Sequence, residues 1–292
     1  MIMELSSWYH LSTENWFRML GLIYPGVWII VLFWLFAFGA CIGSFLNVCI
    51  WRIPRGESLS RASSHCTVCG SPIHWYDNIP VISYLVLRGK CRSCKTPYSC
   101  SYFVVELVSG ALTALLVVKT GIFMQSAAIL PARMILIFLC IACALTDIRY
   151  RIVPDKLTYS GMILALISAF ACPEAWGMQS RSEALLMSLA SGIICGGILL
   201  LFCEICGFFS KEELIGRGDI KFICMCGMLI GIPGTFFSLL AGALGGTLFG
   251  VAVIRKFNAK LPFVPFIAFA ALIWIFFDQK ILDFYLSMFI KS

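Results

Sequence analysis

The sequence predicts an all-α polytopic membrane protein with about eight transmembrane helices and a small zinc-ribbon-like cytoplasmic insertion. Hydrophobic residues make up 60% of the chain, charged residues only 13%, and the mean hydropathy is +0.93. These values lie far outside the range of a soluble domain of this length. The long apolar stretches are separated by short basic ones, and one longer polar stretch carries two Cys-x-x-Cys pairs.

The predicted spans are apolar stretches long enough to cross roughly 30 Å of hydrocarbon. The first is too long for the core of a signal peptide and no small-residue cleavage pattern follows it, so we expect it to be a retained helix. Pro233-Gly234 is expected to separate the sixth and seventh spans. The eight stretches are 26–50, 101–118, 127–146, 157–172, 184–206, 220–237, 238–254 and 262–277.

The orientation follows from the basic loops. Segments 51–100, 147–156, 207–221 and 255–261 hold 16 of the 22 Lys and Arg residues. With eight spans, all four segments fall on one face, which the positive-inside rule assigns to the cytoplasm, with both termini outside. The net charge of +7 is therefore a topology signal, and its spread over four loops argues against nucleic-acid binding.

The insertion 51–100 contains two Cys-x-x-Cys turns, here called knuckles, 21 residues apart. This spacing is close to that of tetrahedral zinc sites with four thiolates, which leave no coordination position for catalysis. A thiol redox pair is the competing interpretation, but the cytosol keeps thiols reduced and a redox enzyme needs one pair. His65 and His74 flank the first knuckle as substitute ligands. The predicted zinc ligands are Cys66, Cys69, Cys91 and Cys94.

The catalytic groups must lie elsewhere. The chain has no Gly-x-Ser-x-Gly elbow, no His-Glu-x-x-His and no phosphate-binding glycine loop. Its three histidines, including His10, all lie outside the apolar spans. Carboxylates at the ends of the spans remain as candidates.

Asp147 ends the third span, and Asp219 begins the sixth after Gly216-Arg217-Gly218. The predicted topology places both at the cytoplasmic face. Two neighbouring carboxyl groups share a proton, so one can act as a general base toward water and the other as a general acid toward a carbonyl oxygen. Gly216 and Gly218 lack Cβ atoms and so let a substrate strand approach the carboxylate.

Two alternative roles remain open for these aspartates. They could cap helices or pair with nearby Arg and Lys at the headgroup level, or they could relay protons in a transporter. Asp155 is the weaker catalytic candidate, since it follows Pro154 like the N-cap of the fourth span. Glu106 could contact a positive group of a substrate or pair with a basic side chain of the insertion, and Asn47 and Glu204 have the same ambiguity.

Several ordered motifs resemble the type IV prepilin peptidase family over about residues 39–266. The chain departs from the family at Ser101-Tyr102-Phe103, where Arg-Tyr-Pro is usual, and at Pro262-Phe263-Val264-Pro265, where Pro-Phe-Gly-Pro is usual. The motifs that carry the resemblance are Gly43-Ser44-Phe45-Leu46-Asn47-Val48 with Arg52-Ile53-Pro54, the two knuckles, Asn78-Ile79-Pro80, Arg88-Gly89-Lys90-Cys91, Val105-Glu106-Leu107, Thr146-Asp147 with Val153-Pro154-Asp155, and Gly216-Arg217-Gly218-Asp219-Ile220-Lys221.

The resemblance implies an aspartic endopeptidase of the GxGD type in the bacterial inner membrane, with Asp147 and Asp219 as its catalytic pair. It implies prepilin or pseudopilin substrates in the lipid bilayer, cut after a glycine on the cytoplasmic side. It also implies N-methylation of the new N-terminus with S-adenosylmethionine, an activity associated with the cysteine-bearing loop. The expected domains are an N-terminal segment and first helix (1–50), the four-cysteine loop (51–100) and the peptidase core (101–292).

Overall fold

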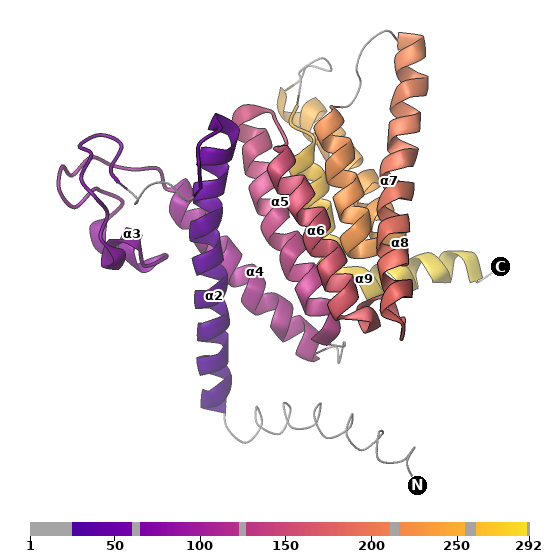
Figure 1. Ribbon diagram of the computed structural model, residues 1–292, viewed down its shortest axis with the longest axis horizontal. Helices are drawn as coiled ribbons and strands as arrows, with labels where there is room; N and C mark the ends of the chain where they lie inside the picture. Colours follow the sequence, from indigo (N-terminus) through magenta and orange to yellow (C-terminus); the bar gives the residue numbers. More distant parts are fainter. Residues whose placement is uncertain (1–24, 60–64, 123–126, 211–215, 255–260, 291–292) are drawn as a thin grey trace. The chain divides into compact units, whose positions relative to one another are not determined.

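The computed structural model describes residues 25–59, 65–122, 127–210, 216–254 and 261–290 (Figure 1). His10 and parts of three basic segments, residues 60–64, 211–215 and 255–260, lie outside the described residues. All regular structure in the described ranges is helical, apart from two isolated β-bridges. The all-α prediction is therefore confirmed.

The chain forms two compact units, and each is described by itself. The first comprises Met1–Phe45 and Ser63–Ala127, and the second Leu46–Ala62 and Ala128–Ser292. The boundary falls inside the first long helix, α2 (Pro25–Arg52).

The first unit contains the start of α2, the four-cysteine insertion and α4 (Ser101–Ile122). Helices α2 and α4 pack closely because glycines face the contact. A Cβ atom on Gly43 would lie 2.9 Å from Glu106 Cα, and one on Gly110 would lie 2.8 Å from the Phe36 ring. Small residues at such crossings are typical of membrane helix pairs, where van der Waals contact drives association.

The insertion has little regular structure: the short 3-10 helix η2 (Trp75–Asn78) and α3 (Ile82–Leu87). It is tied to α4 through aromatic rings. Tyr84 stacks on Phe103 with ring centroids 5.0 Å apart and meets Tyr98 edge-on at 5.4 Å.

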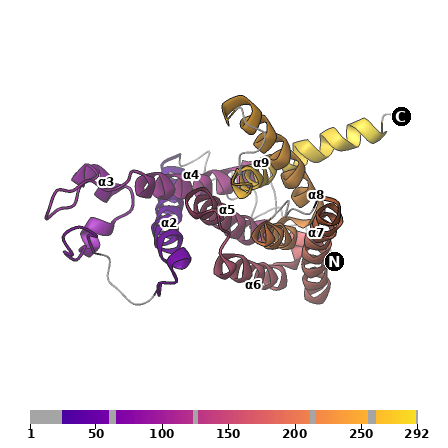
Figure 2. The same cartoon turned by 90° about the horizontal axis from the view of Figure 1, so that it is seen from above.

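The second unit is a bundle of five long helices that buries Leu136, Phe222 and Ile267 in its core (Figures 1 and 2). Short 3-10 helices, η1 (Ile53–Arg55), η3 (Ala127–Ile129) and η4 (Pro173–Trp176), and a π-helical turn, η5 (Gly250–Ile254), extend or join them. The long helices are α5 (Leu130–Tyr150), α6 (Asp155–Ala171), α7 (Arg181–Ser210), α8 (Arg217–Phe249) and α9 (Val264–Ile290).

Helix α8 is two legs joined at Gly231, whose φ of 70° and ψ of −179° are not helical. The first leg, 217–230, runs parallel to α6, because Lys221 lies at Asp155 and Met225 at Gly161. It therefore runs antiparallel to α5, which α6 follows after a short connection.

The second leg, 232–249, runs antiparallel to α9, since Gly234 packs on Trp274 and Gly242 on Ile267. Helix α9 itself is antiparallel to α5, because Val264 contacts Asp147 at one end. The second leg therefore returns toward the end of the unit where the first leg began. These legs correspond to the expected spans 220–237 and 238–254, but the break lies at Gly231 and not at Pro233-Gly234.

Six helices of the described chain are long and apolar enough to cross a membrane, with α8 counted once. Helix α6, the expected fourth span, has 17 residues and is therefore about 25 Å long. The chain is a multi-pass membrane protein, and the predicted number of eight spans is approximate.

Candidate functional site

Asp147 lies at the carboxyl end of α5 and is 6% exposed. The backbone N–H of Val264, the first residue of α9, donates to Asp147 Oδ2 over 3.1 Å. Within the described part of the chain, this carboxylate has no second hydrogen-bond donor. The first N–H groups of a helix lack partners inside it and favour negative charge. Asp147 therefore does bind a helix end, as the capping role requires, but the helix is the distant α9.

Asp219 lies in the first turn of α8 and is half-buried. Its N–H donates to the carbonyl of Gly216, 3.0 Å away, and Gly216 is the N-cap residue of the helix. A Cβ atom on Gly218 would lie 3.0 Å from Val153 Cβ, in the connection between α5 and α6. The absence of a side chain at Gly218 therefore lets the start of α8 pack directly against the residues that follow Asp147.

The two aspartates lie at the same end of the second unit, since Gly218 packs on Val153 shortly after the end of the helix that carries Asp147. Helix α5 also contacts α8 directly. The Arg151 guanidinium acts on Asp147 from just beyond the helix end. The fold therefore places both predicted aspartates at one end of the unit.

Asp155 has a different role from either aspartate. Its carboxylate accepts a hydrogen bond from Lys221 Nζ over 2.6 Å, and its side chain is 59% exposed. Helix α6 begins at Asp155 and its N-cap residue is Pro154, which has no capping side chain. The expectation that Asp155 caps α6 is therefore wrong, because it links α6 to α8 beside Asp219.

The contact between α5 and α9 is held at both ends. Arg133, near the start of α5, pairs with Asp278 and donates to the carbonyl of Ile275 over 3.2 Å. The Asp147–Val264 hydrogen bond lies at the opposite end. Both charged side chains of the ion pair are largely buried. This pair fixes the register of α9 against the helix that carries Asp147.

A third link joins α5 to the segment after α2. Arg55 donates to the hydroxyl of Tyr150 over 2.7 Å and to the carbonyl of Trp51 over 2.8 Å. Its guanidinium lies 3.5 Å from the centroid of the Trp51 ring, a cation–π contact. Basic segments 51–59, 147–156 and 216–221 therefore meet at one end of the second unit.

The four predicted metal ligands form one cluster in the first unit. All four sulfur atoms lie within 4.8 Å of one another, and the Cys66 and Cys94 sulfurs are 3.8 Å apart. A tetrahedral zinc with Zn–S bonds of about 2.3 Å requires sulfur atoms about 3.8 Å apart. The cluster therefore fits a metal such as zinc, and it contains neither His65 nor His74.

The two knuckles repeat one local structure. In each, the first cysteine donates its N–H across the turn, Cys66 to Ser71 and Cys91 to Thr96, both over 2.9 Å. The residue after the second cysteine, Gly70 or Lys95, has a positive φ. Each turn closes with an isolated bridge, His65 to Pro72 and Lys90 to Pro97.

The second cysteine of each knuckle favours the thiolate form. Hydrogen bonds from the Thr96 side chain and backbone lower the pKa of Cys94 to about 6. Hydrogen bonds from Ser71 lower the pKa of Cys69 in the same way. Thiolate is the form that binds metal.

Glu106 pairs with no basic side chain among the described residues. Its Oε2 accepts a hydrogen bond from the Val81 N–H over 2.8 Å, and it also contacts Ser44 of α2. Val81 precedes α3 with a φ of 64°, a conformation that is strained for a β-branched residue. Glu106 thus fastens the insertion to α4. Asn47 is buried in α2, and Glu204 is exposed on α7.

Three features of the second unit were not among those expected from sequence: the Val264 N–H beside Asp147, Arg55 near the same end of α5, and the Arg133–Asp278 pair at the other end. A backbone N–H has no side-chain signature, although prolines on both sides of Phe263-Val264 indicate a helix start. Charged residues inside apolar stretches are unusual enough that Arg133 and Asp278 could have been paired by their opposite sign.

Two protein-family models match the chain. The family model described as "Bacterial Peptidase A24 N-terminal domain" matches residues 37–120, and that described as "Type IV leader peptidase family" matches residues 134–251. No solved structure matches the chain.

Several relatives carry the name "Prepilin leader peptidase/N-methyltransferase". The one from Burkholderia pseudomallei (strain 1026b) is 32% identical over 82% of this chain and 83% of the relative. The one from Bacillus subtilis is 30% identical over 87% of this chain and 97% of the relative. The one from Myxococcus xanthus is 32% identical over 75% of this chain, and the match spans 62% of that relative's length.

The matched segments include both aspartates, the four-cysteine cluster and most of the predicted spans. Family membership favours a leader peptidase over a transporter that uses the same carboxylates. The chain belongs to the type IV leader peptidase family.

Proposed function

We propose that this protein is an aspartic endopeptidase that removes the leader of type IV prepilins or type II secretion pseudopilins. It cuts after a glycine at the cytoplasmic face of the bacterial inner membrane, with Asp147 and Asp219 as its catalytic pair. The observation that supports the proposal is that both aspartates lie at the end of the second unit where three basic segments also gather.

In this mechanism the two carboxyl groups hold one proton between them. The ionised group removes a proton from water, and the protonated group donates to the carbonyl oxygen of the scissile peptide. The Val264 N–H holds Oδ2 of Asp147, which leaves its other oxygen available to water or to Asp219. Gly216 and Gly218 support the loop that carries Asp219 and leave space for an extended substrate strand.

The basic segments support the cytoplasmic assignment, because Lys and Arg are enriched in cytoplasmic loops. The substrate's apolar helix lies in the bilayer beside the bundle, and its leader reaches the aspartates in an extended form. The lipid bilayer and the prepilin are thus the partners, and no nucleic acid is required.

We assign residues 51–100 to a structural zinc site with Cys66, Cys69, Cys91 and Cys94 as ligands. Four thiolates leave the metal no open position, so the zinc stabilises the insertion without activating water. The insertion has few buried apolar side chains, and metal binding takes the place of a core. We place N-methylation with S-adenosylmethionine on this loop and peptidase activity on 101–292. The names of the relatives support both activities.

The test incubates a purified prepilin with the full-length protein in detergent, with and without S-adenosylmethionine. The mass of the product is then measured by mass spectrometry. Asp147→Asn and Asp219→Asn should each abolish cleavage while the protein remains inserted and folded. Asp283→Asn is the matched control, since Asp283 is an exposed aspartate near the end of α9. Normal cleavage by either active-site variant contradicts the proposal. An added mass of one methyl group on the product supports the methylation assignment, and an unmodified product rejects it.

A further inference from the structure

Helix α3 in the insertion exposes its apolar side chains and buries a polar one. Its polar Ser83 is buried and donates to the carbonyl of Ile79 over 2.7 Å. Its apolar side chains Ile82, Leu85 and Val86, at positions i, i+3 and i+4, form one face and are 52–68% exposed. A helix that faces water normally shows the opposite arrangement.

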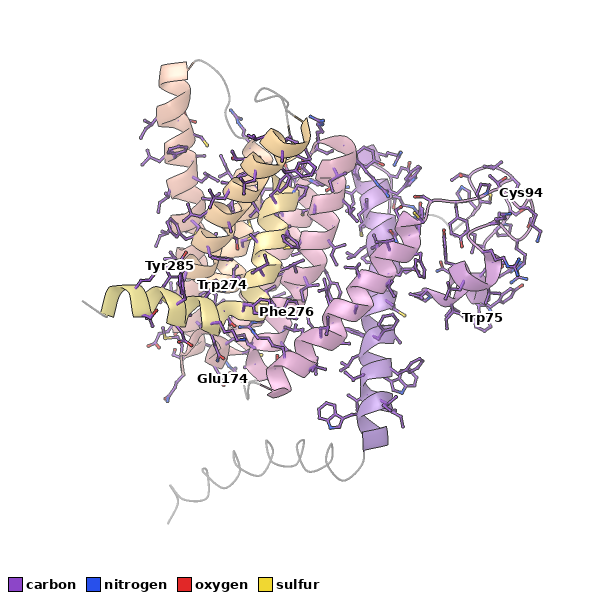
Figure 3. The ribbon with its side chains drawn as sticks, turned by 180° about the vertical axis from the view of Figure 1, so that it is seen from behind. Trp75, Cys94, Glu174, Trp274, Phe276 and Tyr285 are labelled. Carbon is purple, nitrogen blue, oxygen red and sulfur yellow. The ribbon has the colours of Figure 1, made fainter. Side chains whose placement is uncertain are left out.

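The residues before α3 extend this apolar surface. Trp75 is 80% exposed, the largest exposure among the large hydrophobic residues of the described chain, and Ile79 is also exposed. Figure 3 shows Trp75 beside α3, with Cys94 of the metal cluster at the other end of the insertion. Contiguous exposed apolar surface of this kind marks an interaction site. We call this surface the α3 patch: Trp75, Ile79, Ile82, Leu85 and Val86.

Basic residues border the α3 patch. Arg88 and Lys90 follow the helix directly, are exposed, and have no acidic partner among the described residues. The acidic residue of segment 65–100, Asp77, is already bound by Arg92 over 2.8 Å. The charge next to the patch is therefore positive and available to an anionic partner.

Contacts between the insertion and α4 fix the position of the α3 patch along α4. The Tyr84 ring stacks on Phe103, and Val81 donates to Glu106. Both partners lie in the first two turns of α4, an apolar helix long enough to cross the membrane, whose Val104 is exposed. Helix α3 is therefore held at the level where α4 enters the bilayer.

We propose that the α3 patch lies in the membrane surface and binds anionic lipid. Trp75, Leu85 and Val86 enter the boundary between headgroups and acyl chains, as aromatic and aliphatic side chains of interfacial helices do. Arg88 and Lys90 contact the lipid phosphates, which attract basic residues beside a membrane helix. The insertion then has two contacts with the bilayer, α4 and the α3 patch.

Val86 and Val68 provide a matched pair for the test. Both are valines of the insertion with nearly equal exposure, 68% and 66%, but Val68 lies between the cysteines of the first knuckle. An environment-sensitive fluorescent amino acid is placed at one position or the other in the full-length protein, in nanodiscs of phosphatidylglycerol with and without brominated acyl chains. Both labelled proteins should melt at the same temperature as the unlabelled protein.

The fluorescence at position 86 should fall by roughly twofold or more with brominated lipid, while that at position 68 stays constant. Replacing phosphatidylglycerol by phosphatidylcholine should weaken the quenching at position 86. Equal quenching at the two positions, or quenching at 86 that ignores lipid charge, overturns the proposal. A photo-crosslinker at position 86 that captures another segment of the protein, or a second copy, in place of lipid also overturns it.

Discussion

The hydrogen bond from the Val264 N–H to Asp147 can be removed without changing either catalytic carboxylate. Val264 is the first residue of α9, and the carbonyl of Phe263 accepts from the N–H groups of Phe266 and Ile267 over 3.2 and 3.4 Å. Proline is well tolerated at the first position of a helix, because its missing N–H has no partner inside the helix. Val264→Pro should therefore preserve α9 and delete only the bond to Asp147.

The expected loss follows from the charge of the acceptor. A hydrogen bond to a charged group contributes about 1.5–3 kcal/mol, so kcat/KM should fall roughly 10- to 150-fold if Asp147 must be held in place for the reaction. Val264→Gly is the control: it keeps the N–H and introduces the glycine that the family resemblance places here. It should retain most of the activity, although it removes a buried side chain and should lower the melting temperature.

The assay is the initial rate of leader removal from a purified prepilin, measured beside thermal unfolding of each variant. Two results would refute the reasoning. One is a Val264→Pro protein that cleaves at the rate of the unmodified enzyme. The other is a Val264→Gly protein that loses as much activity as Val264→Pro, since the bond is intact in the former.

Three further predictions concern the supports of the two units. Asp278→Ala leaves the Arg133 guanidinium buried without its carboxylate and should lower the free energy of unfolding by about 3 kcal/mol. The double variant Arg133→Met with Asp278→Leu should recover most of that loss in thermal unfolding. Equal losses in the two variants exclude the ion pair as the cause. Glu106→Leu removes the acceptor of the Val81 N–H and should speed limited proteolysis within the insertion, whereas Glu106→Gln should not. Identical digestion of the two variants contradicts the role of Glu106 in fastening the insertion to α4. Cys91→Ser should abolish zinc binding, measured by mass spectrometry of the metal. The variant should also lose methylation but keep leader cleavage. Loss of cleavage in a folded Cys91→Ser protein contradicts a purely structural zinc.

Patterns of side chains predicted the long helices and the cysteine cluster. Apolar stretches marked the helices because a bilayer accepts few polar groups along a span. The spacing of Cys66, Cys69, Cys91 and Cys94 predicted a cluster that the structure brings within metal-binding distance. Local sequence suffices here, because each knuckle forms from consecutive residues.

The features that the sequence did not predict depend on contacts between residues far apart in the chain. The Val264 N–H is a backbone group, and only the antiparallel packing of α9 on α5 brings it to Asp147. Asp155 resembled an N-cap because it follows a proline, but the parallel packing of α6 and α8 gives it Lys221 as a partner. Glu106 satisfies a backbone N–H of an irregular loop, a role that no charge pattern predicts.

The reversal of α8 at Gly231 should affect the membrane around the protein. The first leg rises only about 21 Å from Arg217 to the turn, and α6 about 25 Å, against roughly 30 Å of hydrocarbon. Trp176, between α6 and α7, lies beside Gly231 at the far end of both elements. Because α6 exposes Ile163, Ile167 and Phe170, we expect a hydrophobic mismatch along this flank, which a thinner bilayer would relieve. The stability of the helix pair, and the depth at which a substrate helix rests against it, should therefore depend on the acyl-chain length of the surrounding lipids.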